Sequence, residues 1–270
     1  MNPIQSILVH MDAGPQCAPR LHLARCLAAH FGAGVAALYA VTPVAVEMAL
    51  DLGTAHKSLF EFDDARRAAA RELVTSVCAQ PGIEIEWREA SEAPEYSAIR
   101  EALYADLLVL GQHDHAQRDT GVLPDFVPSV LIASGKPALV VPYIGARAAM
   151  FQTVMVAWKE TREAARALAA ALPILRAAAA VHVALAGDTE SEHQTQLQRY
   201  LQRHGVQARC HTLASTASLA GESILSMVAD LGADLLVMGC YGHSRARELV
   251  LGGASRTVLD SMTVPVLMAH

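Results

Sequence analysis

The sequence predicts an α/β fold that occurs twice: two open parallel five-stranded sheets, each with helices on both faces. Two observations predict it. ADLLVLG at 105–111 returns as ADLLVMG at 233–239, which is 128 positions later. In addition, short apolar runs rich in β-branched residues alternate with longer segments of helical periodicity, as expected for strands that are buried on both faces. This alternation is typical of parallel strands joined by right-handed helical crossovers.

The repeat also predicts two domains. The apolar segment after Pro137 matches the one after Pro265 at the same offset. The first strand recurs as SILVHMD and TVMVAWK, but here the offset is 147 because the first copy carries an extra segment at 42–59. This segment is apolar and is expected to cover the sheet as a loop and helix; the alternatives are a flap over a small apolar pocket and a dimer contact. The linker YIGARAAMFQ sets the expected boundary, with one domain at 1–148 and the other at 149–270.

The elements of the second copy follow in order. Strands are expected at 154–158, 181–186, 206–210, 235–238 and 264–268, where apolar runs are bounded by polar residues or glycine. Helices are expected at 161–178, 190–204, 219–231 and 254–262. Thr161 is expected to cap the first helix and Trp158 to lie in the core. The fifth strands of the two copies are expected to face each other, because exposed apolar sheet edges promote aggregation.

Composition and charge exclude several classes of function. The 270 residues are 53% hydrophobic, yet no run of eighteen apolar residues is uninterrupted, which argues against a membrane span. We expect a cytoplasmic protein, since no secretory signal is visible.

The five cysteines are scattered without a CxxC pair, which argues against a disulfide framework or a zinc knuckle. Residues 1–148 carry 17 acidic and 11 basic side chains, which argues against nucleic-acid binding, whereas 149–270 carry 10 of each and can accept a small anion.

The stretch GCYGHSRARELVLGGAS at 239–255 carries the clearest functional pattern. Gly239 ends the fourth strand, Gly242 follows two residues later, and Gly252 and Gly253 precede the last helix. Without a Cβ, such residues let the backbone approach a polyphosphate closely, and the helix start offers N–H donors and the positive end of its dipole. Ser255 is placed to add a hydroxyl. The alternative is two tight turns and a glycine-rich helix entry, because a glycine pattern alone is weak support.

This pattern resembles the universal stress protein (UspA) family over essentially the whole chain, twice over. The resemblance implies a Rossmann-like fold of the adenine nucleotide alpha hydrolase type, in which nucleotide-binding members hold ATP phosphates with a GxxGx(9)G(S/T) loop. Gly239, Gly242 and Gly252 match that loop. Gly253 replaces its Ser or Thr, and Ser255 corresponds to a second hydroxyl position. ATP is therefore the expected ligand of the second copy, with AMP or ADP as alternatives.

Each copy departs from the family pattern differently. The family places an Asp at the tip of the first strand, near the adenosine, and Lys159 occupies that position in the second copy. The first copy keeps this acid as Asp12, but Asp114 replaces the second glycine, and Pro124 with Asp125 replaces the pair at the helix start. One copy therefore has the acid without the loop, and the other has the loop without the acid.

The polar residues at the same edge of the first copy allow a second interpretation. Two end the first strand and three follow the fourth, so that these imidazoles and carboxylates can converge on a transition metal. The residues are His10, Asp12, His113, Asp114 and His115. The alternative is a solvated polar loop.

We expect a stress-response binding protein with little or no turnover. No GxxxxGK[ST] motif is present. Near the glycine loop the acids are Asp234 and Glu248, which are too few to hold magnesium and also activate water for fast hydrolysis. One alternative is a scaffold that binds no nucleotide, in which the tandem copies form a pseudo-dimer and act through a partner protein or another small ligand. A slow ATPase and a homodimer of the whole chain also stay open.

Overall fold

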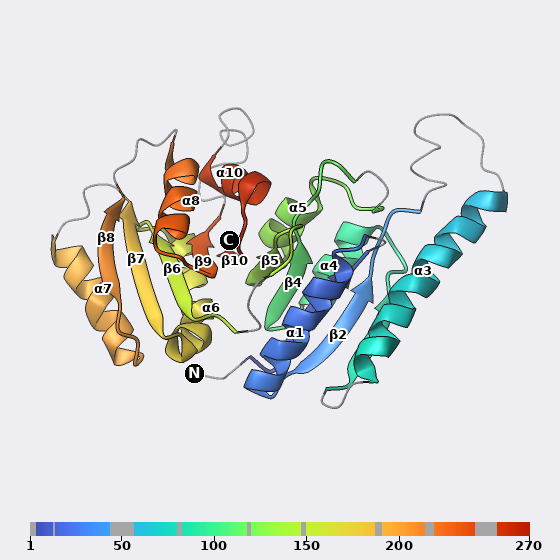
Figure 1. Ribbon diagram of the computed structural model, residues 1–270, viewed down its shortest axis with the longest axis horizontal. Helices are drawn as coiled ribbons and strands as arrows, with labels where there is room; N and C mark the ends of the chain where they lie inside the picture. Colours follow the sequence, from blue (N-terminus) through green and yellow to red (C-terminus); the bar gives the residue numbers. More distant parts are fainter. Residues whose placement is uncertain are drawn as a thin grey trace. The chain divides into compact units, whose positions relative to one another are not determined.

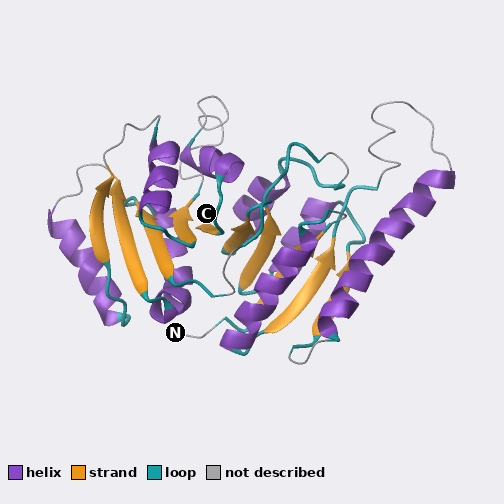
Figure 2. Cartoon of the chain, viewed as in Figure 1, coloured by secondary structure: helices purple, strands orange, loops and turns teal. Residues whose placement is uncertain are grey.

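The computed structural model of the chain describes residues 4–12, 14–43, 57–79, 83–117, 120–146, 150–186, 191–213, 219–240 and 253–270. Helices and strands alternate along it (Figures 1 and 2). They form two compact units: Met1–Lys136 with Tyr143–Gly145, and Pro137–Pro142 with Ala146–His270. The predicted α/β class is confirmed.

The first unit contains four parallel strands in the order β3-β2-β1-β4. In chain order its elements are β1 (Ser6–Met11), α1 (Cys17–Phe31), β2 (Gly34–Tyr39), α3 (Lys57–Cys78), β3 (Ile85–Glu89), α4 (Pro94–Ala102), β4 (Leu107–Gly111) and α5 (Phe126–Ser134). The chain passes from β1 outward to β3 and then returns to β4, so the strand order reverses between β1 and β4. In an open α/β sheet, this reversal marks the place where ligands bind.

The second unit repeats this arrangement around β6 and β9. Its elements are β5 (Ala138–Val141), β6 (Thr153–Trp158), α6 (Arg162–Ala177), β7 (Ala180–Ala186), α7 (Ser191–Arg203), β8 (Arg209–Leu213), α8 (Ala220–Asp230), β9 (Leu235–Gly239), α10 (Ala254–Ser261) and β10 (Val266–Ala269). The strand order is β5-β10-β9-β6-β7-β8, and β10, β9, β6, β7 and β8 run parallel to one another.

β5 belongs to the second unit although it lies in the first copy of the repeat. It pairs with β10 in antiparallel orientation, with Val140 opposite Val266 and Leu139 opposite Leu267. All four of its side chains are at most 1% exposed. The pairing of the two fifth strands expected from the sequence is therefore confirmed, and it covers an edge that is apolar along its whole length.

One predicted strand is misplaced. The sequence analysis put a strand at 206–210, but β8 begins at Arg209. Gly205 has a φ of 75°, and the N–H of Val206 donates to the carbonyl of Leu201 at 2.9 Å. Val206 is 2% exposed and thus belongs to the hydrophobic closure of α7, which commonly follows a left-handed glycine.

The extra segment of the first copy is described only in part. Residues 44–56 lie outside the described residues, and α3, which starts at Lys57, follows them. Among the described helices, none combines the length and the apolar character that a membrane crossing requires.

Candidate functional site

The structure describes three of the five residues predicted to bind nucleotide. Gly239 ends β9, Gly253 is the N-cap of α10, and Ser255 lies in the first turn of α10 and is 5% exposed. Gly242 and Gly252 lie outside the described residues. The carboxyl end of β9 and the start of α10 are thus the described parts of this site.

Gly239 is needed by the packing of its own unit. A Cβ at this position would lie 2.4 Å from the backbone N of Ala164 and 2.6 Å from the backbone C of Glu163. The first turn of α6 therefore approaches the end of β9 so closely that any side chain other than hydrogen would collide with backbone. This contact accounts for the first glycine of the loop without any ligand.

The start of α10 is built from backbone alone. Gly253 has an extended conformation, with a φ of −67° and a ψ of 160°, and no side chain caps the helix at this position. Its carbonyl accepts hydrogen bonds from the N–H groups of Arg256 and Thr257 at 2.9 and 3.1 Å. The N–H groups before them belong to the first turn, where the helix itself offers no acceptors, and together with the helix dipole they favour an anion.

The end of β6 presents a cation where the resemblance implies an acid. Lys159 follows β6 and is exposed. Thr161 caps α6, as predicted, by accepting a hydrogen bond from the N–H of Ala164 at 3.2 Å. Trp158 is half-buried, so the prediction that it belongs to the core is wrong.

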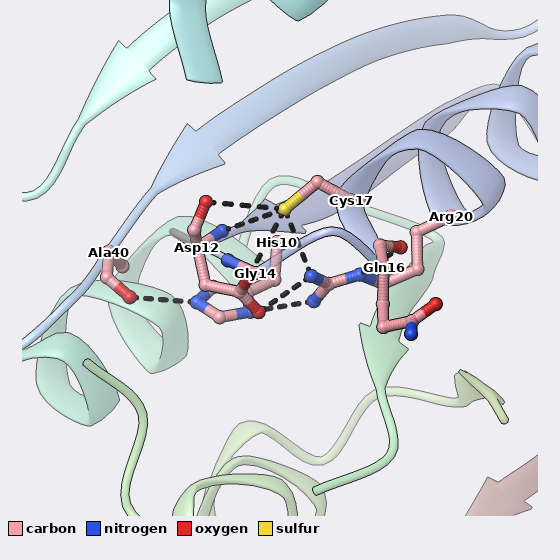
Figure 3. A network of polar contacts seen from close by, with 7 residues as sticks. All are labelled: His10, Asp12, Gly14, Gln16, Cys17, Arg20 and Ala40. Atoms are coloured by element: carbon pink, nitrogen blue, oxygen red, sulfur yellow. Dashed lines mark hydrogen bonds and ion pairs between the residues drawn. The ribbon is translucent and has the colours of Figure 1, made fainter. Parts of the chain in front are cut away.

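In the first unit, the strand-tip acid is already paired. Asp12 follows β1, and its Oδ2 lies 2.6 Å from Nη2 of Arg20 on α1 (Figure 3). Arg20 is 1% exposed, and its Nε also donates to the carbonyl of Gln16 at 3.2 Å. Burial by itself would raise the pKa of Asp12, but the charge of Arg20 and the hydrogen bonds hold it below its usual value. Asp12 is therefore a carboxylate neutralised from within the protein.

His10 completes the buried cluster as a neutral imidazole. Nη1 of Arg20 lies 3.3 Å from Nδ1 of His10, and since arginine only donates, Nδ1 must accept. The proton is then on Nε2, which donates to the carbonyl of Ala40 at 2.8 Å (Figure 3). Burial, together with the positive charge of Arg20, lowers the pKa of His10 to about 4.

Cys17 closes the cluster from the first turn of α1. Nη2 of Arg20 donates to its Sγ at 3.0 Å, and the thiol lies 3.2 Å from Oδ1 of Asp12. Burial raises the pKa of Cys17 to about 12, so the group is a thiol at neutral pH and a poor nucleophile.

Arg20 also occupies the space beside Gly111, the counterpart of Gly239. A Cβ on Gly111 would lie 2.6 Å from Nη1 of Arg20. The remaining cavity has a volume of about 30 Å³, and its walls include His10, Asp12, Arg20, His113 and Asp114. That volume is about the share of one water molecule in the liquid.

The structure gives no support to the metal interpretation of this edge. Among the described residues, no group of three or more His, Cys, Asp or Glu side chains is arranged to hold a metal ion. His10 and Asp12 are instead engaged by Arg20, while the rings of His113 and His115 contact each other edge to face at 4.8 Å.

Sequence reasoning missed Arg20 and Cys17. A signal was present, since Arg20 stands among residues of α1 that are otherwise apolar on its buried face, such as Leu21, Leu23 and Leu27. A cation in such a position requires a buried partner, and Asp12 is the acid close to it in the sequence.

Comparison with known proteins agrees with the fold. The family model described as "Universal stress protein family" matches residues 3–142 and again 150–270. "Universal stress protein Slr1230" of Synechocystis is 28% identical over 172 residues, which make up 60% of this chain; the match spans only 57% of that relative's length.

Two solved structures resemble the whole chain. A universal stress protein from Archaeoglobus fulgidus has a TM-score of 0.73 at 17% identity, with 98% of this chain and 95% of that chain covered. A functionally unknown protein from Pseudomonas aeruginosa PAO1 has a TM-score of 0.61 at 15% identity, with 98% and 92% covered. The family model accounts for nearly all residues in two consecutive matches. The chain belongs to the universal stress protein family, as a member with two tandem domains.

Proposed function

We propose that the second unit binds an adenine nucleotide, ATP first and AMP or ADP as alternatives, at Gly239, Gly242, Gly252, Gly253 and Ser255. Backbone N–H donors and the start of α10 hold the phosphates, and the nucleotide is bound with little or no hydrolysis. The protein then acts in a stress response as a cytoplasmic binding protein. The observation that carries the proposal is the helix start at Gly253, which has no side-chain cap and lies beyond a parallel strand of the sheet.

The neighbouring acid supports binding without turnover. Asp234 stands before β9, at the amino end of the strand, where its carboxylate accepts hydrogen bonds from the N–H groups of Gln152 and Thr153 at 2.8 and 3.1 Å. It therefore fixes the start of β6 at the edge of the sheet opposite to the glycine loop. A carboxylate in that place has no access to a phosphate beyond the carboxyl ends.

The first unit is not proposed to bind nucleotide. Arg20 neutralises Asp12 and fills the space beside Gly111, and a cavity of about 30 Å³ is too small for a nucleoside. The loop residues Asp114 and Asp125 add negative charge where phosphates would lie.

Calorimetric titration of the purified protein with ATP tests the proposal. Gly242→Asp adds a carboxylate within the phosphate loop and is expected to abolish the heat of binding. Asp114→Asn, at the matching position of the first copy, is expected to leave it unchanged. Equal heats for the protein and for Gly242→Asp, or no heat for either, would remove the site. Release of phosphate that persists in Gly252→Asp would show that any ATPase activity arises elsewhere.

A second candidate is a tandem scaffold that acts through a partner protein, either alone or as a homodimer, and binds no nucleotide. Lys159 favours it, because the family's acid near the adenosine is missing from the unit that keeps the loop. Mass spectrometry of the freshly purified protein separates the two candidates. Adenine nucleotide retained in stoichiometric amount would contradict the scaffold.

A further inference from the structure

A groove on the second unit involves none of the residues proposed to bind nucleotide. It has a volume of about 510 Å³ and lies between α6 and α7, beside the end of β6. Pockets that hold small organic ligands have volumes of roughly 300–1,000 Å³. The groove is therefore large enough for such a ligand.

The walls of the groove are apolar and partly aromatic. Leu168 of α6 and Leu197 of α7 are buried, while Trp158 is half-buried and Tyr200 is 38% exposed. In the first unit, Met11 ends β1 as Trp158 ends β6, and Met11 is fully buried. The indole is thus accessible where its counterpart in the other unit is covered.

The rim of the groove carries negative charge. The carboxylate of Glu160 lies on it, in contact with an imidazole: Nδ1 of His193 is 2.9 Å from Oε1 of Glu160. The side chain of Glu160 stays 50% exposed. Among the described residues that line the groove, none is lysine or arginine. An anionic ligand would meet this carboxylate with no lysine or arginine among the lining residues to offset it, whereas a cation gains both the attraction of the carboxylate and the faces of the aromatic rings.

We propose that this groove binds a planar aromatic amine, a ligand beyond the proposed nucleotide. Its ring packs against Leu168, Leu197 and Trp158, and its ammonium group lies near Glu160. The arrangement matches the general composition of ligand pockets, in which apolar walls provide affinity and a few polar groups fix orientation.

The two tryptophans of the chain make the groove measurable. Trp87 lies on β3 of the first unit, so Trp87→Phe leaves Trp158 as the single fluorophore. The probes are 2-naphthylmethylamine and 2-naphthoate, which share a ring system and carry opposite charge. We expect saturable quenching of Trp158 by the amine and binding of the carboxylate that is weaker by about tenfold or more.

Three variants test the location of binding. Ala165 is exposed on α6 and lines the groove, so Ala165→Phe is expected to fill it and abolish saturation. Ala177→Phe, an exposed position at the end of the same helix, is the matched control and is expected to bind like the parent. Glu160→Gln is expected to remove the preference for the amine while the fold stays intact, since its side chain is half exposed.

The proposal is overturned if neither probe saturates, if the naphthoate binds as tightly as the amine, or if Ala165→Phe binds like the parent while folded. Competition by excess ATP would also overturn it, because the groove would then belong to the nucleotide site. Binding of the amine that is insensitive to ATP and to Gly242→Asp supports the groove even if ATP itself gives no calorimetric heat, so the two proposals fail independently.

Discussion

Arg20 is a buried cation, and all of the groups that it contacts belong to the first unit. It contacts a carboxylate, an imidazole nitrogen, a thiol and a carbonyl, all within 3.3 Å (Figure 3). Buried charges are tolerated when their donors find acceptors, and here each of the three guanidinium nitrogens has at least one. The end of β1, beside the point where the strand order reverses, is therefore filled by a side chain of the protein. Removing that side chain would leave Asp12 without its counter-ion.

We predict that Arg20→Met destabilises the first unit by about 3–5 kcal/mol, because Asp12 is left as a buried charge without a counter-ion. In a Trp158→Phe background, urea unfolding followed by the fluorescence of Trp87 measures the change in that unit. Arg100→Met is the matched control: its ion pair with Glu92 is 46% exposed on both sides, and we expect a loss below about 1 kcal/mol. Adding Asp12→Asn to Arg20→Met is expected to recover part of the loss. A first unit that tolerates Arg20→Met as well as it tolerates Arg100→Met would contradict the assignment.

We also predict that acid weakens the first unit through His10. The unfolded chain takes up this proton near pH 6.5, whereas the folded unit takes it up only near pH 4. The contribution of neutral His10 to the free energy of unfolding is therefore fully present above pH 6.5. It is lost as the pH falls from 6.5 to 4, and the loss is at most about 3 kcal/mol. The lowered pKa of Asp12 acts in the same direction at still lower pH.

The pH dependence is measured as the free energy of unfolding at a series of pH values, again through Trp87. His10→Gln keeps an acceptor for Arg20 and a donor for Ala40 but does not titrate, so its stability is expected to change less across this range. Parallel curves for the parent and His10→Gln would show that another group is responsible.

For single residues, the sequence predicts well which side chains lie at the ends of strands, and it predicts poorly which side chains pair with them. The repeat and the family resemblance together place Asp12 at the end of β1. Its pairing with Arg20 depends on how α1 packs over the sheet, and an eight-residue separation across a strand-to-helix turn does not determine that geometry. The same holds for His10, which was considered as a metal ligand and accepts a hydrogen bond from Arg20 instead.

At the scale of elements, the packing of α6 on β9 determines what the glycine loop tolerates. Gly239→Ala is predicted to destabilise the second unit by about 1–3 kcal/mol, because the added methyl meets the backbone of Ala164 at 2.4 Å. In the Trp87→Phe background, Trp158 fluorescence during urea unfolding reports this unit. Gly34→Ala, followed through Trp87 in the first unit with Trp158→Phe, is the control, since its nearest neighbour is a backbone oxygen at 3.9 Å, and we expect little change. An unchanged midpoint for Gly239→Ala would mean that α6 shifts freely. Because a substitution of Gly239 would disturb the packing of α6 as well as the loop, loss of ATP binding in such a variant would not identify the nucleotide site. Gly242→Asp therefore tests that site.

Element boundaries follow from the sequence where a capping residue marks them. Thr161 and Gly232 fix the ends of their helices within one or two residues, since a side-chain acceptor and a left-handed glycine are local signals. The start of β8 does not follow from the sequence in this way, because Val206 is apolar in order to pack against α7, the helix before it. An apolar residue after a glycine can be either the residue that packs against the end of a helix or the first residue of a strand, and only the contact with α7 distinguishes the two.

At the scale of the whole molecule, β5 ties the two copies of the sequence together. A fragment starting at residue 149, the boundary expected from the repeat, would contain β10 without β5, its antiparallel neighbour. We predict that this fragment aggregates more strongly than a fragment starting at 137, because it lacks the strand that pairs with β10, and an apolar strand edge pairs with other chains when it is uncovered. Size-exclusion chromatography with light scattering compares them. Equal solubility of the two fragments would show that β5 is dispensable.

The same strand pair imposes an order on folding. Val140 meets Val266, a residue 126 positions further along the chain. Contacts of such long range form slowly, since a large loop must close first, and domains made on the ribosome tend to fold from the amino end. Until that intervening chain has been made, the edge of β5 that pairs with β10 stays open, and chaperone binding at this apolar segment would keep it from pairing with other chains.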